Sequence, residues 1–145
     1  MDAVWPTAVT DFEAFLKKEG LVCREREISE SFDNKFVQYE NANIGVRVVC
    51  DRSFWSVDIT DIAGRPNEWY DTGIVRDLIL GSGEDVLLLP EQIKIIEANW
   101  SAILDRFSAA KREDTHARLK HFENERMKRR LPGFWESMNP QGKSR

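Results

Sequence analysis

The sequence contains little of what usually identifies an enzyme or a membrane protein from its residues alone. It has two cysteines, Cys23 and Cys50, and two histidines, His116 and His121. Its longest uninterrupted apolar run covers residues 86–89, far short of the roughly 18 residues that a membrane-spanning helix requires. The N-terminus has no cationic segment followed by an apolar one, so we expect no signal peptide and a reducing cytoplasm as the location.

The few histidines and cysteines limit the chemistry that the chain can perform. His116 and His121 fall on one charged helical pattern, about 140° apart around its axis, so they cannot share a metal and are predicted to be solvated. The two cysteines lie in strand-like runs without metal-ligand spacing and are predicted to be buried thiols. Gly81-Ser82-Gly83 lacks the lysine of a phosphate-binding loop. We therefore expect no catalytic residue, no metal site and no cofactor.

Charge is abundant and unevenly distributed. The net charge is −4, but residues 1–107 carry 20 acidic against 11 basic side chains, which gives −9. Residues 108–145 carry 5 acidic against 10 basic side chains, which gives +5. Such an acidic body repels nucleic acid phosphates and attracts a basic protein. The same acidity also serves solubility alone, so it does not decide between a binding role and a solvated surface.

The first half of the chain predicts one helix followed by a meander. A capping-box pattern at Thr10 and Glu13 and apolar residues at helical spacing predict a helix that ends at Gly20. Alternating or extended patterns then predict four strands over residues 21–28, 35–40, 44–50 and 54–62, the first a charged edge strand. Short turns between them indicate antiparallel hairpins.

The second half predicts helices. Residues 64–67 are interpreted as a loop, and Asp71 or Thr72 is expected to cap a short helix that ends near residue 80. A longer helix starting at Pro90 and a charged, loosely packed helix over about 109–130 follow. The apolar stripe of the longer helix comprises Ile93, Ile96, Trp100, Ile103, Leu104 and Phe107.

Together these patterns predict one α+β domain over residues 1–131. It contains an N-terminal helix, a four-stranded antiparallel meander and three helices packed mainly on one sheet face. Pro132-Gly133 ends the last helix, and residues 132–145 are predicted to form a partly disordered tail, disordered from residue 139.

Aromatic residues beside carboxylates mark the candidate binding site. Trp69 and Tyr70 follow a proline-bearing loop and stand between two acidic residues, an arrangement typical of anchors at protein interfaces. The alternative is an aromatic plug that seals the edge of the sheet. We predict that a protein partner binds a loop and rim formed by Asp51, Arg52, Asp61, Glu68, Trp69, Tyr70 and Asp71.

Three neighbouring segments carry a resemblance to a known class of proteins. Residues 46–55 (VRVVCDRSFW), residues 67–71 (NEWYD) and the apolar residues 74–80 together resemble small bacterial immunity proteins, which are encoded beside polymorphic or contact-dependent toxins. The resemblance covers residues 44–80. It implies a non-enzymatic protein that neutralises a cognate toxin by stoichiometric binding, and the acidic body suits a basic toxin domain. The positively charged last helix departs from a uniformly acidic decoy of nucleic acid.

Two other functions remain open from the residues. Asp58, Asp61, Glu68 and Asp71 supply carboxylates for a small acid–base enzyme, although Asp58 and Asp61 are three apart in a strand and therefore point to opposite faces. The basic run 128–130 at the end of the last helix suits a nucleic-acid-binding regulator. The same run also complements the helix dipole, so nucleic acid is the less expected partner.

Overall fold

Five strands form one antiparallel sheet in chain order, preceded by one helix and followed by several more. The computed structural model describes residues 5–29, 34–81 and 88–138. The strands are β1 (Val22–Ser29), β2 (Asn34–Glu40), β3 (Ile44–Asp51), β4 (Phe54–Asp61) and β5 (Arg65–Asp71). The helices are α1 (Thr7–Lys18), α2 (Thr72–Leu80), α3 (Leu89–Ala98), α4 (Trp100–Arg106), the 3₁₀ turn η1 (Ala109–Lys111), α5 (Arg112–Arg130) and α6 (Pro132–Met138).

The α+β class and the antiparallel meander are confirmed, but the count of four strands is wrong. Residues 65–67, predicted as part of a loop, form the first part of a fifth strand, β5, which pairs with β4 between Asp58 and Asp61 through a shifted register. The buried hydroxyl of Thr60 donates to the carbonyl oxygens of Arg65 and Glu68 and ties this irregular strand down. Pro66 is tolerated because β5 is an edge strand.

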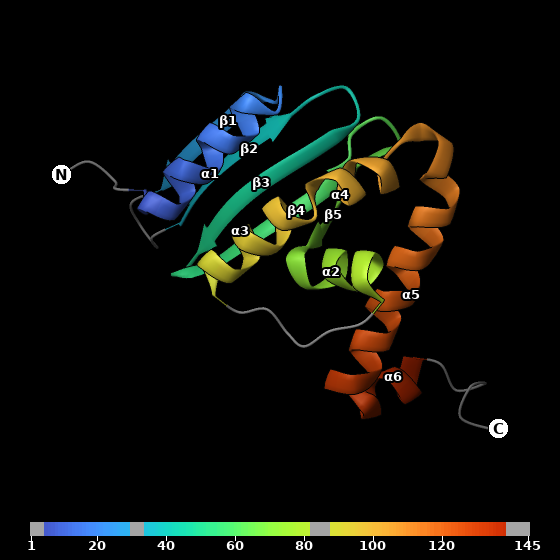
Figure 1. Cartoon of the computed structure of the whole chain (residues 1–145). Coiled ribbons are helices and arrows are strands. Elements are labelled where there is room, and N and C mark those ends of the chain that lie inside the picture. The colour runs from blue at the N-terminus through green and yellow to red at the C-terminus, as the bar shows by residue number, and fades with distance from the viewer. Residues whose placement is uncertain (1–4, 30–33, 82–87, 139–145) are drawn as a thin grey trace.

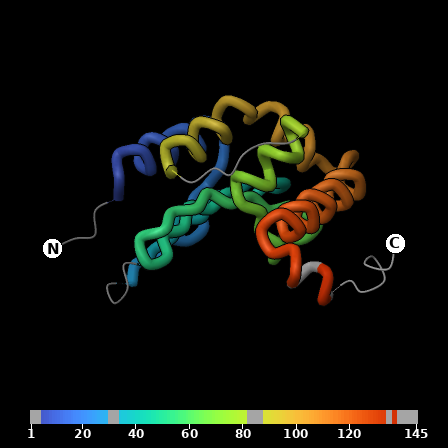
Figure 2. The backbone as a smooth tube through the Cα atoms, turned by 90° about the horizontal axis from the view of Figure 1, so that it is seen from below, coloured from blue at the N-terminus to red at the C-terminus, as the bar shows by residue number. Residues whose placement is uncertain are grey.

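The helices lie mainly on one side of the sheet. Helices α1, α3 and α4 pass over the same face, and α5 runs beside α2 at the β5 end (Figures 1 and 2). None of the helices in the described ranges is long and apolar enough to cross a membrane. Alternation along β2 and β3 points one set of side chains toward the helices and the other set toward the uncovered face.

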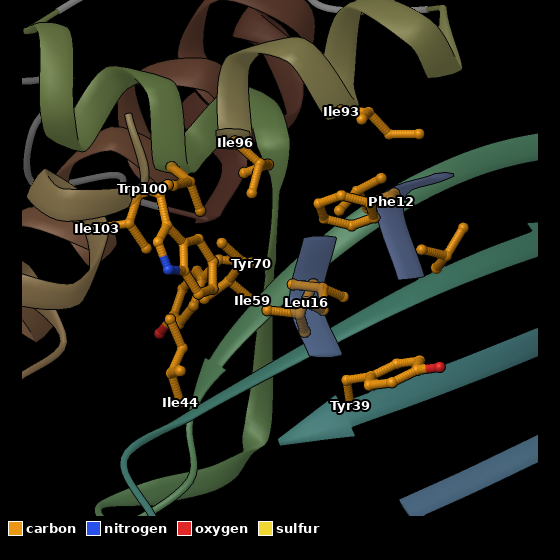
Figure 3. Packing of buried hydrophobic residues seen from close by; sticks show 14 of the residues in the cluster. Phe12, Leu16, Tyr39, Ile44, Ile59, Tyr70, Ile93, Ile96, Trp100 and Ile103 are labelled. Carbon is orange, nitrogen blue, oxygen red and sulfur yellow. The ribbon is translucent and has the colours of Figure 1, made fainter. Parts of the chain in front are cut away.

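The core forms where three helices meet the inner face of the sheet. Side chains from α1, α3 and α4 point toward residues of β2, β3, β4 and β5 in one continuous layer (Figure 3). Trp100 is 6% exposed and packs edge-on against Phe15, with 5.6 Å between ring centroids. The prediction that Trp100 belongs to the core is confirmed.

Helix α1 begins earlier than its sequence predicts. Pro6 precedes its first turn, and no side chain caps it, so the capping-box prediction is wrong. Glu13 faces the sheet instead, where its carboxylate accepts a hydrogen bond from the Tyr39 hydroxyl at 2.7 Å and pairs with Arg26. Burial and the adjacent Glu13 carboxylate raise the pKa of Tyr39. A buried carboxylate with two partners thus joins α1 to β1 and β2.

One side chain completes the hydrogen bonding of β4. Because β5 pairs only with the last part of β4, the backbone near Trp55 and Val57 has β3 on one side and no strand on the other. The buried amide of Gln92 accepts from Val57 N at 2.8 Å and donates to Trp55 O at 3.0 Å. Thr72 donates its hydroxyl to Val57 O at 2.8 Å. These polar atoms replace the missing strand and fix α3 and α2 over β4.

The later helices differ from their predicted form. The stripe-bearing helix is interrupted at Asn99, whose amide donates to Ile95 O at 2.8 Å. The last long helix, α5, is not loosely packed, because Thr115, His116 and Leu119 are buried. Beyond it, residues 132–138 form α6, while residues 139–145 lie outside the described residues. Cys50 is buried as expected, but Cys23 is exposed on the edge strand.

The burial of Trp100 generates a stability prediction. Replacing Trp100 by Ala should lower the free energy of unfolding by about 3–5 kcal/mol, as truncation of a large buried aromatic does. Leu104→Ala is the matched control, because Leu104 is 38% exposed on the same helix and should cost under about 1 kcal/mol. Urea unfolding followed by circular dichroism measures both, and equal losses would contradict the assigned core.

Candidate functional site

The outer face of the sheet gathers side chains that the helices do not cover. Over much of β2 and β3 the buried residues alternate with half-buried or exposed ones that point away from the helices, whereas β4 is buried from Val57 to Asp61. Phe36, Val49 and Ser56 lie side by side across these three strands, and Glu27 of β1 continues the same row. The row combines an apolar centre with an acidic end.

An open groove lies on this face at the end nearest the β3–β4 turn. Its volume is about 370 Å³. It is lined by Glu27, Ile28, Ser29, Asn34, Lys35, Phe36, Val49, Cys50 and Asp51. Phe54 stands opposite Asp51 in the ladder and is 81% exposed. An exposed aromatic beside an apolar groove is the kind of surface that protein partners use.

The β3–β4 turn places Asp51 and Arg52 at the edge of that groove. Arg52 and Ser53 have φ angles of 53° and 71°, which make a tight two-residue hairpin turn from residues other than glycine. The left-handed conformation costs roughly 1–2 kcal/mol for such residues. A hydrogen bond from Arg52 N to Asn34 Oδ1 at 2.9 Å supports the turn.

Trp69 lies in β5 rather than in a loop, and its ring reaches Arg47 of β3 on the same outer face. The Arg47 guanidinium is 4.4 Å from the centroid of the Trp69 ring and also pairs with Asp58 at 3.2 Å. Arg47 and Asp58 are directly opposite in the β3–β4 ladder. This arrangement holds the indole against the sheet and leaves it half-buried at the surface.

The seven predicted binding residues do not form one continuous rim. Asp51 and Arg52 precede β4, whereas Asp61 ends it, so they are separated by about 20 Å at the rise of an extended strand. Glu68, Trp69, Tyr70 and Asp71 belong to β5, and Tyr70 is buried. Asp51, Arg52 and Trp69 reach the outer face, whereas Asp61, Tyr70 and Asp71 make contacts within the fold.

Asp61 is the most enclosed of these residues, at 2% exposure. Its Oδ2 accepts from Arg112 Nε at 2.8 Å and lies 3.1 Å from His116 Nε2, while Oδ1 accepts from Gly64 N at 3.0 Å. Burial opposes ionisation of the carboxyl, but the hydrogen bonds from Arg112, His116 and Gly64 outweigh it and lower the pKa of Asp61. Asp61 therefore anchors α5 to the end of β4.

The prediction that His116 is a solvated histidine is wrong. Its ring is buried between α5 and the sheet, and Nε2 must carry the proton because an ionised Asp61 only accepts. The other ring nitrogen, Nδ1, has no hydrogen-bond partner in the described residues and lies 4.0 Å from Glu68 Oε2. Burial and the Glu68 charge raise the pKa of the neighbouring Tyr70 to about 12.

Asp71 serves two structural contacts. Its Oδ1 accepts from Ile74 N at 3.1 Å, so the prediction that it caps the following helix is confirmed. Arg126 of α5 donates to both carboxylate oxygens at 2.8 and 2.9 Å. Asp61 and Asp71 thus fasten the two halves of α5, a role that the sequence does not reveal because the partners are 55 residues away.

The carboxylates offered for acid–base chemistry are each paired with a cation. Asp58 pairs with Arg47, Glu68 lies 3.6 Å from Arg65, and the other two hold α5. Within the described ranges, no group of three or more His, Cys, Asp and Glu side chains is placed to bind a metal ion.

Comparison of the chain with known protein families, curated proteins and solved structures finds no match.

The lowered pKa of Asp61 generates a prediction about acid stability. A carboxyl with a lower pKa in the folded state stabilises the fold above its unfolded pKa of about 4 and loses that contribution as the pH falls through the folded value. Asp61→Asn should therefore destabilise the protein at pH 7 by about 1–3 kcal/mol. The difference from the wild type should shrink below pH 4.

Urea unfolding at pH 7, 5 and 3 measures this difference. Asp105→Asn is the control, because Asp105 pairs with Lys111 on an exposed surface and should change stability little. A difference between wild type and Asp61→Asn that stays constant down to pH 3 would contradict the anchoring role.

Proposed function

We propose that this protein is a non-enzymatic binding protein of the immunity type, which neutralises a cognate bacterial toxin by stoichiometric binding. We further propose that the toxin docks on the outer face of the sheet and not along a continuous rim of all seven predicted residues. The observation that carries this proposal is that the exposed Phe54, the adjacent groove with its apolar floor and the half-buried Trp69 lie on one face.

Charge supports a basic partner. Residues 1–107, which contain the whole sheet, carry a net charge of −9. Such a field accelerates encounter with a positively charged domain and weakens as salt increases. Asp51 and Glu27 contribute to it at the groove itself, so the charge lies beside the apolar contact surface.

The internal use of Asp61 and Asp71 supports binding over catalysis. Their oxygens are occupied by arginine, histidine and backbone amides, and the His116 ring is too enclosed for a substrate to reach without movement of α5. These groups stabilise the platform that presents the outer face.

A second candidate is a nucleic-acid-binding regulator that uses the end of α5. A groove of about 380 Å³ there is lined in part by Lys120, Arg126 and Arg130. However, Lys120 lies 3.8 Å from Glu123, and Arg126 is committed to Asp71. Affinity for DNA that falls steeply with salt would favour this candidate over protein binding.

Co-expression with the product of the neighbouring gene tests the main proposal. We expect the neighbouring gene to encode a protein that arrests growth when expressed alone, and we expect co-expression to restore growth and yield a one-to-one complex on gel filtration. A neighbouring product that is harmless and forms no complex would overturn the proposal.

Within such a complex, Trp69→Ala should raise the dissociation constant about 30-fold, which corresponds to about 2 kcal/mol for an interface hot spot. Leu104→Ala is the control on the helix-covered side and should leave affinity unchanged. Calorimetry with folded variants measures both, and an unaltered dissociation constant for Trp69→Ala would place the interface away from this part of the sheet.

A further inference from the structure

The groove on the outer face has an apolar floor with a carboxylate on each side. Phe36 and Val49 are paired across β2 and β3 and form the floor. Glu27 lies opposite Phe36 on β1, and Asp51 lies two residues beyond Val49 on β3. β1 and β3 are separated by two strand spacings, about 10 Å, so the gap between the two acids has room for one side chain.

The two groove carboxylates differ from Glu40 and Asp58 on the same face. Glu40 pairs with Arg24 at 2.9 Å, and Asp58 pairs with Arg47. Glu27 and Asp51 form no ion pair with any other residue in the described part of the chain, and both are exposed. The ammonium of Lys35, the basic residue of the groove lining, lies 5.4 Å from the centroid of the Trp55 ring.

This combination selects one kind of ligand group. An apolar side chain alone would cover the floor but would desolvate the two carboxylates without compensation. An acidic group would be repelled by both. A lysine or arginine side chain satisfies both requirements, because its aliphatic stem packs on apolar surface while its charged end pairs with carboxylates.

We infer that this groove is a recognition site for a lysine or arginine side chain of a protein partner, with the stem on Phe36 and Val49 and the charge between Glu27 and Asp51. The inference rests on the proposed function for the identity of the partner. It names the chemical group that the partner must present, and Phe54 at the turn supplies apolar contact for the residues beside that group.

Two capped tripeptides test the inference without the natural partner. The probes are Ac-Leu-Arg-Leu-NH₂ and Ac-Leu-Gln-Leu-NH₂, titrated into the ¹⁵N-labelled full chain at low salt and followed by two-dimensional NMR. We expect saturable shifts at the amides of Glu27, Phe36, Val49 and Asp51 with the arginine peptide, and at least fivefold weaker binding of the glutamine peptide.

The double variant Glu27→Gln/Asp51→Asn should weaken the arginine peptide at least fivefold. The control variant Glu19→Gln/Glu25→Gln makes the same change in net charge at exposed positions outside the groove lining and should bind as the wild type does. Equal affinity for the two peptides, equal loss in the two double variants, or shifts centred elsewhere would each overturn the inference.

The inference about the groove and the proposed function can be overturned independently of each other. If the toxin complex forms but Glu27→Gln/Asp51→Asn binds the toxin as tightly as the control variant does, the groove is not the recognition site and the immunity function stands. If the arginine peptide binds as expected while the neighbouring gene product is harmless and forms no complex, the groove stands and the immunity function is wrong.

Discussion

The incomplete pairing between β4 and β5 determines how the rest of this protein is arranged. Because β5 does not reach the backbone at Trp55 and Val57, that side of β4 has no strand neighbour, and the amide of Gln92 takes its place. This requirement fixes α3 above β4, and Thr72 fixes the start of α2 beside it. The helices are thereby confined to one layer, and the opposite face of the sheet remains free to present Phe54, Val49 and Trp69.

The acidic side chains fall into two groups, structural and surface-exposed, that composition alone cannot distinguish. Glu13, Asp61 and Asp71 are joined to side chains of distant elements and hold α1 and α5 in place. Glu27 and Asp51 remain at the surface of the sheet. A buried carboxylate contributes to stability only while its partners surround it, so the residues that looked most available for binding are those on which the fold relies.

Local patterns predicted the parts of the fold that depend on local interactions. The sequence predicts β3 and β4 from their alternating apolar residues, the burial of Trp100 from its place on an apolar stripe, and the helix cap at Asp71. β5 was not predicted, because Pro66 and Asn67 indicate a turn and its pairing depends on Thr60. The burial of His116 was hidden because α5 is charged on most sides and its inward contacts are ion pairs. The candidate surface was found only in part, since Phe36 and Val49 meet through strand register.

The edge strand β1 has a consequence for how copies of this protein meet one another. All eight of its residues are exposed, and Arg24, Glu25, Arg26 and Glu27 alternate in sign. When two such edges pair antiparallel in a register centred on one of residues 24–27, arginine stands opposite arginine or glutamate opposite glutamate. These registers juxtapose like charges, so the charge pattern of the strand disfavours edge-to-edge pairing of two copies.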